Sequence, residues 1–489
     1  MLKRMKNTKI FKFIPIILAV LLAAGAFSAC SKKSESTQTT TTATTSAAEV
    51  LAAGSDVTVD ENATATIALN GSSATVKGEG VKVDGATVLI TAGGTFSISG
   101  TLDDGSVIVD ADGQNVTLLL NGANITCSYS SAIYVYNAKS ATVYVKEGTE
   151  NTLSDGSTYT YKDSYSSAAE EEPNACLYAK DDLTVAGSGS LTVKGNFNNG
   201  IVSKDTLQIE NVTLTVTAKN NGINGKDFLS VKKATLKVTA GGDALRSTND
   251  TDTALGYIVI ASSKLTLTAK EDGMQAQTYI SIASSQMKIS AGGGSSVSAS
   301  DDVSSKGIKA GTDITVKGGT YVIDASDDAM HTNGNITVSD GTFTLTTADD
   351  GIHADNSLTI DGGTFTITGH EGLEATLITI NDGDITIAAS DDGMNAAQKV
   401  SGVTPCVEIN GGKITINMGQ GDTDAIDSNG NVIINGGTVN ITGQSGFDYD
   451  GTGELNGGTV YVNGERQTAL TNQFAGGGMG DPGGMGGRP

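Results

Sequence analysis

Residues Asp327–Ala348 read DDAMHTNGNITVSDGTFTLTTA, and two similar blocks follow directly. They are DDGIHADNSLTIDGGTFTITG over 349–369 and HEGLEATLITINDGDITIAAS over 370–390, after which DDGM begins again. Each block has an acidic turn, a small residue, a large apolar residue and two short alternating runs. A repeat of 21–22 residues is typical of stacked structural units rather than of a conventional globular core.

The small residue and the apolar residue after it recur along most of the chain. Most intervals are 21–24 residues. We interpret the interval from Ala132 to Cys176 as two periods, and three longer intervals as loop insertions near 249–255, 294–304 and 398–404. The small positions are Ala132, Cys176, Gly200, Gly222, Ala244, Gly273, Gly307, Ala329, Gly351, Gly372, Gly393, Ala425 and Gly446.

Each repeat offers about three strands of period-two alternation, separated by Gly, Asn and Asp turns. Three strands in each 21–22-residue turn predict an all-β fold, a right-handed parallel β-helix of about 13 or more turns. A leucine-rich repeat would need spaced leucines, and a nine-residue calcium β-roll has a different period. The apolar residues of the repeat should stack in the interior, among them Ile201, Ile223, Ile308, Ile352 and Ile426.

Composition narrows the class of partner. The 489 residues include 63 Gly, 5 Pro and no Trp, and the formal charge is −23. So acidic a chain excludes nucleic acid and anionic membrane surfaces as partners, and it favours cations or ligands bound through cations. The cysteines beyond the leader, Cys127, Cys176 and Cys406, are odd in number, which indicates buried free thiols rather than a disulfide framework.

The chain divides into four predicted parts. Residues 1–29 have the basic start and apolar run of a secretion signal, and Phe27-Ser28-Ala29-Cys30 resembles a bacterial lipobox. Lipidation of Cys30 would anchor the protein on the extracellular face of the bacterial cell membrane, its only membrane contact; ordinary cleavage is the alternative. Residues 30–56 are a predicted disordered Ser/Thr linker, 57–470 the β-helix, and 471–489 a disordered Gly/Met-rich tail.

Carboxylates accumulate in the turns that precede the small residue. Asp suits turns in any protein, but here acids of neighbouring turns would stack about 4.8 Å apart and repel. We therefore predict bound cations, and calcium best fits loose sets of carboxylate and carbonyl oxygens. The candidate ligands are Asp243, Asp272, Asp327, Asp328, Asp349, Asp350, Glu371, Asp391 and Asp392.

A polar position follows the large apolar residue and should face outward, because side chains alternate along a strand. Stacked turns would align it into a stripe suited to a polymer chain, beside a column of small residues that a flat ligand could approach. An ordinary solvated sheet face explains the stripe equally well, and its two stacked histidines could bind a transition metal or nothing. The candidate carbohydrate-binding residues are Arg246, Gln275, Lys309, His331, His353, Glu374, Asn395 and Asp427.

Three separate motifs agree in a family resemblance over roughly Val57 to Asn463. They are ITAGGTFSISGTLDDGSVIVDADGQNVTLLLNGANITC over Ile90–Cys127, EPNACLYAKDD over Glu172–Asp182, and the DDGI-type repeats. Together they resemble the bacterial surface family of carbohydrate-binding domain-containing proteins, right-handed β-helices similar in fold to pectate lyases. The resemblance implies calcium binding and non-catalytic affinity for plant cell-wall polysaccharide, either cellulose or acidic sugars such as polygalacturonate.

Two other functions remain open. A calcium-dependent lyase or a glycosidase would need paired acids or a base, and Glu374 and Asp427, two turns apart, are one such pair. Arg246 is the one arginine in the repeats, however, and a lyase commonly needs such a base beside its metal. A passive adhesin or stalk would need the shaft alone. We predict a non-catalytic binder.

Overall fold

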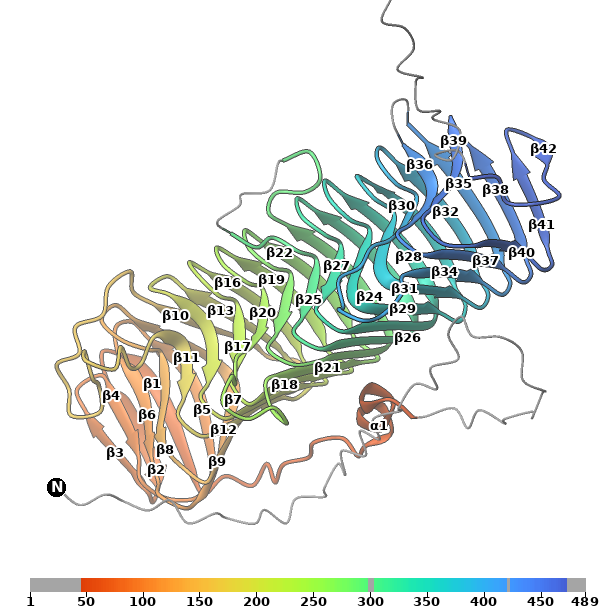
Figure 1. Ribbon diagram of the computed structural model, residues 1–489. Coiled ribbons are helices and arrows are strands. Elements are labelled where there is room, and N and C mark those ends of the chain that lie inside the picture. Colours follow the sequence, from red (N-terminus) through yellow and green to blue (C-terminus); the bar gives the residue numbers. More distant parts are fainter. Residues whose placement is uncertain (1–44, 298–302, 420–422, 473–489) are drawn as a thin grey trace, which may run out of the picture.

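The computed structural model describes residues 45–297, 303–419 and 423–472 as one elongated shaft (Figure 1). Successive strands turn through three faces, and each strand pairs in parallel with the strand one turn further along the chain. The fold is therefore an all-β parallel solenoid, as the repeat predicts. The predicted signal, Cys30 and most of the C-terminal tail lie outside the described residues.

The first face carries the small-apolar repeat. Its strands are β4 (Thr87–Ile90), β6 (Ser106–Asp110), β8 (Ile133–Asn137), β11 (Ala175–Ala179), β14 (Asn199–Ser203), β17 (Ile223–Gly225), β20 (Leu245–Ser247), β23 (Met274–Ala276), β25 (Ile308–Ala310), β27 (Met330–Thr332), the starts of β29 (Ile352–Ile360) and β31 (Leu373–Ile380), β33 (Met394–Ala396), β36 (Asp424–Ser428) and β39 (Ser445–Tyr449).

The other two faces share several long strands. The second face has the starts of β5 (Gly94–Leu102) and β7 (Asn115–Cys127), β9 (Ser140–Val145), β12 (Asp182–Ala186), β15 (Thr206–Glu210), β18 (Phe228–Lys232), β21 (Tyr257–Ala261), the starts of β24 (Ile280–Ala291), β26 (Asp313–Ala325) and β28 (Asn335–Thr347), the ends of β29 and β31, β34 (Cys406–Ile409), β37 (Asn431–Ile434) and β40 (Gly453–Leu455). The third has the ends of β5, β7, β24, β26 and β28, with β10 (Glu150–Asp155), β13 (Ser190–Gly195), β16 (Thr213–Ala218), β19 (Thr235–Ala240), β22 (Lys264–Ala269), β30 (Thr364–Gly369), β32 (Asp384–Ala389), β35 (Lys413–Met418), β38 (Thr438–Thr442) and β41 (Thr459–Val462).

The predicted register is confirmed along the first face. Ile201 pairs with Ile223, Met330 with Ile352, and Met394 with Ile426, and all of these side chains are fully buried. One interval is corrected. Leu177 pairs directly with Ile133, so the long stretch from Ala132 to Cys176 is a single turn carrying an insertion, not two turns.

The small position of the repeat faces inward, where there is no room for a side chain. A Cβ atom on Gly372 would lie 2.3 Å from the carbonyl oxygen of Gly393 and 2.5 Å from a methyl group of Ile387. Alanines in the same column, such as Ala329, are fully buried. The column is thus a packing requirement, and the expectation that a flat ligand approaches it from outside is wrong.

Buried rings stack along the axis of the interior. The centroids of Tyr321 and Phe343 are 4.6 Å apart, and those of Phe343 and Phe365 are 4.5 Å apart, with nearly parallel planes. The spacing follows from the strand separation of a sheet, about 4.8 Å. Cys127, Cys176 and Cys406 are buried and form no disulfide within the described residues, which agrees with the prediction.

Both ends of the solenoid have antiparallel pairs in place of a further turn. At the N-terminal end these are β1 (Ala65–Gly71) with β2 (Ala74–Gly78), and β3 (Val81–Asp84) with β4. At the other end β41 pairs with β42 (Glu465–Arg466). Such hairpins end the stack, because an open parallel edge would invite pairing with another chain.

Part of the predicted linker is structured. Helix α1 (Ala47–Ala53) begins with a capping box between Ser46 and Glu49 and lies against the second face (Figure 1). Ala48 is fully buried there, and Glu49 forms an ion pair of 2.9 Å with Lys317. The expectation of disorder up to residue 56 is therefore corrected. Among the described residues no helix is long and apolar enough to span a membrane.

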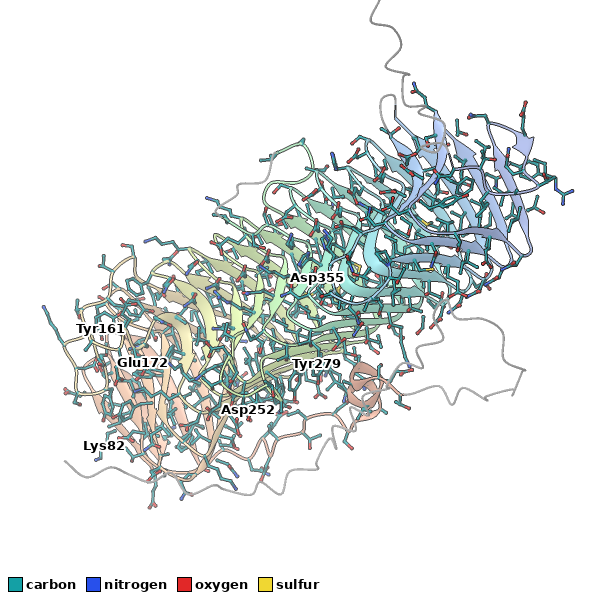
Figure 2. The ribbon with its side chains drawn as sticks, viewed as in Figure 1. Lys82, Tyr161, Glu172, Asp252, Tyr279 and Asp355 are labelled. Atoms are coloured by element: carbon teal, nitrogen blue, oxygen red, sulfur yellow. The ribbon has the colours of Figure 1, made fainter. Side chains whose placement is uncertain are left out.

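The insertion after β10 covers the shaft near its N-terminal end (Figure 2). Tyr159 stacks on Phe197 with centroids 4.2 Å apart, and its hydroxyl donates to Asp155 at 2.7 Å. Tyr134 in turn donates to the backbone oxygen of Tyr165 at 3.1 Å. Tyr159 is thus used for covering the solenoid rather than for presenting a ring to solvent.

Candidate functional site: a polar stripe on the first face

The predicted polar stripe exists. One polar residue per turn lies beside its counterpart in the next turn, on the outward side of the first face, because the residue before each is the buried apolar position. In chain order the stripe is Asn224, Arg246, Gln275, Lys309, His331, His353, Glu374, Asn395, Asp427 and Asp448.

The acids before the small position form a hydrogen-bonded ladder. A carboxylate oxygen of Asp243 accepts from the backbone N–H of Asp272 at 3.0 Å, and Asp272 accepts from the N–H of Lys306 at 2.8 Å. Asp392 accepts from the N–H of Asp424 at 3.1 Å. Hydrogen bonds from the backbone stabilise the charged form of a carboxylate, so stacking alone does not require an ion at every turn.

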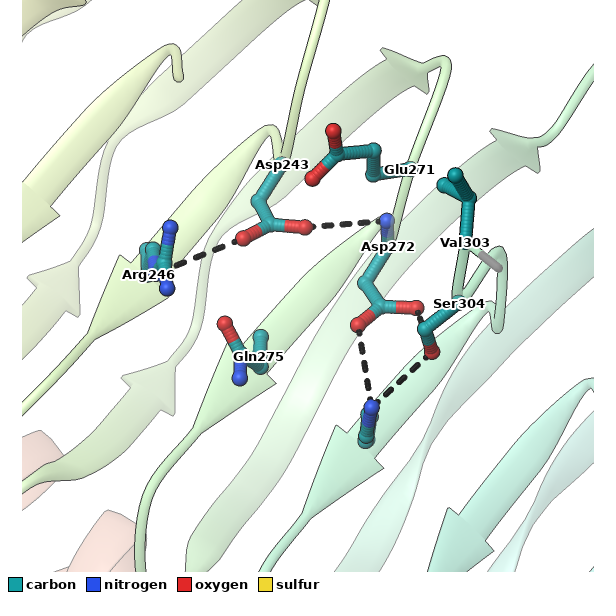
Figure 3. A pocket seen from close by; sticks show the side chains of 8 residues that line it. Asp243, Arg246, Glu271, Asp272, Gln275, Val303 and Ser304 are labelled. Atoms are coloured by element: carbon teal, nitrogen blue, oxygen red, sulfur yellow. Dashed lines mark hydrogen bonds and ion pairs between the residues drawn. The ribbon is translucent and has the colours of Figure 1, made fainter. Parts of the chain in front are cut away.

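The first zone of the stripe is a pocket of about 220 Å³ (Figure 3). Arg246, Gln275 and Lys309 reach it from three successive turns of the first face. Asp243 lies 3.4 Å from Nε of Arg246, and Asp272 lies 3.7 Å from Nζ of Lys309. Val303 and Ser304 of the insertion before β25 close one side. Glu271 adds a third carboxylate to the lining. We call this the basic pocket after Arg246 and Lys309.

The paired acids of the basic pocket are deeply buried. Asp243 is 3% exposed and Asp272 is 2% exposed. Burial, followed by the charge of Asp272, raises the pKa of Asp243 to about 7, although the Arg246 charge opposes the shift. The two acids therefore hold the basic side chains in place, and they are poorly placed to be calcium ligands.

The second zone is a cluster of two histidines and three carboxylates. Nδ1 of His331 lies 2.8 Å from Asp328, and the rings of His331 and His353 have centroids 4.7 Å apart. Nδ1 of His353 lies 2.9 Å from oxygens of both Asp350 and Glu374. We call these five residues the histidine cluster.

Two lysines complete this zone. Nζ of Lys306 lies 2.5 Å from Asp327 and 2.7 Å from Asp328, and Nζ of Lys399 lies 2.7 Å from Glu374. Burial opposes ionisation of Glu374, but hydrogen bonds from His353 and Lys399 outweigh it and lower its pKa to about 2. Lys399 belongs to the 398–404 insertion, so nothing in the repeat pattern predicted its role.

The third zone is acidic. Here Glu371, Asp392, Asp424 and Asp427 lie on neighbouring turns, and within the described residues none has a Lys, Arg or His side chain within 4.0 Å. Burial, followed by the charges of Asp350 and Glu374, raises the pKa of Glu371 to about 8. Burial, followed mainly by the charges of other acids, raises the pKa of Asp392 to about 7 and that of Asp427 to about 6.

Orphaned oxygens mark the acidic zone. Asn395 donates from Nδ2 to Oε1 of Glu371 at 3.2 Å, while Oε2 of Glu371 and Oδ1 of Asn395 are buried without a hydrogen-bond partner. A buried acceptor without a partner costs about 1–3 kcal/mol. Of the nine predicted calcium ligands, Glu371 and Asp392 are thus the best placed, and Asp391, 3.9 Å from the half-exposed His370, is next to Asp392 in the chain. The other buried candidates are paired with cationic or histidine side chains: Asp243, Asp272, Asp327, Asp328 and Asp350. Asp349 is exposed beside Asp327 and Asp328.

A second hollow of about 370 Å³ lies at the N-terminal end of the first face. Lys82, Asp84, Tyr129 and Tyr165 are among the residues that line it, and Leu89 and Ile108 form an apolar wall. Sequence reasoning missed this hollow. The tyrosines of the 156–174 insertion were the available signal, but only the path of the insertion shows which of them reach it.

Fold and site together define a parallel solenoid with a stripe of polar side chains along one face. The chain matches the family model of carbohydrate-binding domain-containing proteins over residues 84–351 and 348–473. It belongs to that family.

Known relatives cover parts of the chain. A carbohydrate-binding domain-containing protein of Acetivibrio thermocellus is 38% identical over 141 residues, which are 29% of this chain and 48% of that protein. The chain thus spans about half the length of this curated relative. A solved structure of the polysaccharide lyase-like protein from C. thermocellum, a gadolinium derivative, is 32% identical and covers 47% of this chain and 92% of its own, with a TM-score of 0.44.

Proposed function

We propose that this chain binds polysaccharide along the stripe of the first face without cleaving it. The observation that carries the proposal is the convergence of Arg246, Gln275 and Lys309, from three successive turns, on one pocket. Family membership supports carbohydrate as the ligand. A polymer suits the stripe because one polar side chain follows another at each turn along the shaft.

The sugar is of the acidic class, such as polygalacturonate. A guanidinium and an ammonium two turns apart can bind carboxylates of neighbouring sugar units, and Arg is well suited to bidentate recognition of a carboxylate. Gln275 between them offers a donor and an acceptor for hydroxyl groups. Cellulose, which is neutral, would gain nothing from the two charges.

Calcium occupies the acidic zone in this proposal. Glu371, Asp391, Asp392 and Asn395 supply oxygens, and the orphaned oxygens of Glu371 and Asn395 need a donor or a cation. Calcium accepts six to eight oxygens in loose geometry. An ion with an open position would bridge the protein to a uronate carboxylate, which reconciles a formal charge of −23 with an acidic ligand.

The protein is placed outside the cell. Lipid at Cys30 would hold it on the extracellular face of the bacterial membrane, with the segment up to α1 as a spacer. We also propose that the solenoid is right-handed, the usual hand of parallel crossovers.

A catalytic alternative rests on one observation. Glu371 and Glu374 are three residues apart, and their pKa values are shifted in opposite directions, upward for Glu371 and downward for Glu374. Such pairs often divide the roles of acid and base. We expect no catalysis, because Arg246, the candidate base, lies five turns from this pair. Incubation with polygalacturonate and calcium should yield neither unsaturated-uronide absorbance nor reducing ends.

A glycan array tests the proposal most broadly. We expect binding to polygalacturonate with calcium present and much weaker binding after chelation. Binding to cellulose alone, unaffected by chelator, would contradict the acidic-sugar and calcium assignments. Binding to no glycan would favour a passive adhesin or stalk.

A further inference from the structure

The histidine cluster contains three ligand-type atoms that the proposed sugar and calcium sites leave unused. Oδ2 of Asp350 and Oε2 of Glu374 each lie 2.9 Å from Nδ1 of His353. One ring nitrogen carries at most one hydrogen, so it can make only one good hydrogen bond. Only one of the two carboxylate oxygens can accept the hydrogen on Nδ1, and the other lies at 2.9 Å from the same nitrogen with no hydrogen between them. Both carboxylates are 6% exposed, so water does not relieve this crowding.

The residues that contact the far sides of His353 and Glu374 resemble those that usually hold metal-binding side chains in position. Nε2 of His353 is buried without a hydrogen bond, and Oδ1 of Asp355 lies 3.4 Å from it. Nζ of Lys399 lies 2.7 Å from the other oxygen of Glu374. A metal-bound histidine typically donates its second N–H to a carboxylate, and bound carboxylates are themselves held by donors.

We propose that Asp350, His353 and Glu374 bind one divalent transition-metal ion of the zinc type. The ligand atoms would be Oδ2, Nδ1 and Oε2, and the ion would displace the proton from Nδ1. A set of one imidazole and two carboxylates suits zinc and its neighbours, whereas calcium and magnesium prefer oxygen alone. Ligands at about 2.1 Å from a tetrahedral ion lie about 3.4 Å apart, so each of the two oxygens must move about 0.5 Å farther from Nδ1.

With three protein ligands the fourth position of the ion is open. Zinc sites with three protein ligands keep a water or an exogenous ligand in that position. The site lies in the stripe, two turns beyond the basic pocket, so the open position can take a sugar oxygen or a water.

A second nearby group is less suitable. Asp328, His331 and His353 also bring ligand atoms within 4.8 Å of one another. Nζ of Lys306, however, lies 2.7 Å from the same Asp328 oxygen that faces His331. A buried ammonium at that distance repels an incoming cation, whereas Lys399 binds the oxygen of Glu374 that points away from His353.

Calorimetric titration of zinc into tag-free, chelator-treated protein tests the site, with cobalt absorption as a second readout of tetrahedral nitrogen and oxygen ligation. We expect one ion per chain. His353→Gln and Glu374→Gln should each weaken binding by about tenfold or more, and Asp355→Asn by about tenfold with all three ligands retained. Asp355→Asn also serves if a ligand variant fails to fold.

Two histidine variants are matched controls. His331→Gln alters the neighbouring ring, and His370→Gln alters a half-exposed histidine in the next turn; both should keep full zinc affinity. The proposal is overturned if the protein takes up no stoichiometric zinc, if His331→Gln loses as much affinity as His353→Gln, or if millimolar calcium displaces the zinc. None of these results depends on whether sugar is bound, so they leave the proposed function to its own tests.

Discussion

Asn395 donates one hydrogen bond of 3.2 Å to Glu371, while the other carboxylate oxygen of Glu371 and the amide oxygen of Asn395 are buried without a partner. The two residues lie on adjacent turns of the first face. Farther toward the N-terminus the acids hold Arg246, Lys309, Lys306 and the histidines. The acidic zone thus combines unpaired charge with unsatisfied oxygens, which is why we place calcium there.

Glu371→Gln tests that placement. In chelator at neutral pH the variant should melt a few degrees higher than the wild type, because it removes a carboxyl group whose ionisation is opposed in the folded state by burial and by neighbouring acids. In calcium the order should reverse, since the wild type alone gains the bound ion. Differential scanning calorimetry with and without calcium measures both effects.

A suitable control for this experiment is Asp384→Asn on the third face, where the side chain is exposed and pairs with Lys413 at 3.3 Å. The control should show the same calcium-dependent gain as the wild type. If Glu371→Gln keeps the full calcium response, the ion is bound elsewhere or not at all.

Ile352→Asp tests the stacked interior. Ile352 is fully buried between Met330 and Leu373, so an ionised carboxylate there would have no partner. We expect a loss of more than about 4 kcal/mol. Because the turns of a solenoid depend on their neighbours, hydrogen exchange should rise first in the adjacent turns.

The outward-facing Thr366→Asp on β30 is the matched control for that substitution, because its side chain points to solvent. It should change stability by less than about 0.5 kcal/mol. Equal effects of the two variants would contradict the assignment of inside and outside.

Asp155 should make stability depend on pH. It is 3% exposed, and burial raises its pKa to about 6 despite hydrogen bonds from Tyr159 and the backbone. Well below the ordinary Asp pKa of 3.8, the residue is protonated in both the folded and the unfolded state, and its burial then leaves the free energy of unfolding unchanged. As pH rises, the unfolded state loses its proton first, so the folded state is disfavoured by about 3 kcal/mol above pH 6.

Asp155→Asn should remove this loss. The amide can still accept from the Asn196 N–H and can donate to the Tyr159 hydroxyl, which in turn donates to the backbone oxygen of Ala175 at 3.1 Å. Relative to the wild type, the variant should gain stability between pH 4 and pH 7 in denaturant titrations. A constant difference between the two proteins across this range would show that Asp155 does not titrate as described.

The sequence predicted the solenoid well because its repeat is parallel and in register. The same slot falls on the same face at every turn, so Ile201 and Ile426 could be assigned to the interior without a structure. The prediction of two turns between Ala132 and Cys176 was wrong, because an insertion of nearly one repeat length gives the same spacing as an additional turn.

The site was only partly predictable. The strand register predicted which polar residues form the stripe, but not that Asp243 and Arg246 pair within one turn, or that Lys399 reaches Glu374 from a loop. Those pairings depend on the length of the side chains and on the path of the loop, and the repeat pattern contains no information about either. Helix α1 was missed because its seven residues gain their stability from the second face rather than from their own composition.

Titration of polygalacturonate fragments into the wild type, Arg246→Ala and Lys288→Ala, with calcium present, tests the central claim most directly. Lys288 is an exposed lysine on the third face and serves as the control for lost charge. We expect Arg246→Ala to weaken binding by about tenfold or more, as loss of a charged hydrogen-bonding partner does, and Lys288→Ala to bind as the wild type does. Equal affinity of all three proteins would contradict the account. So would a loss of affinity in Tyr165→Ala, a fourth protein altered at the N-terminal hollow, if Arg246→Ala shows no loss.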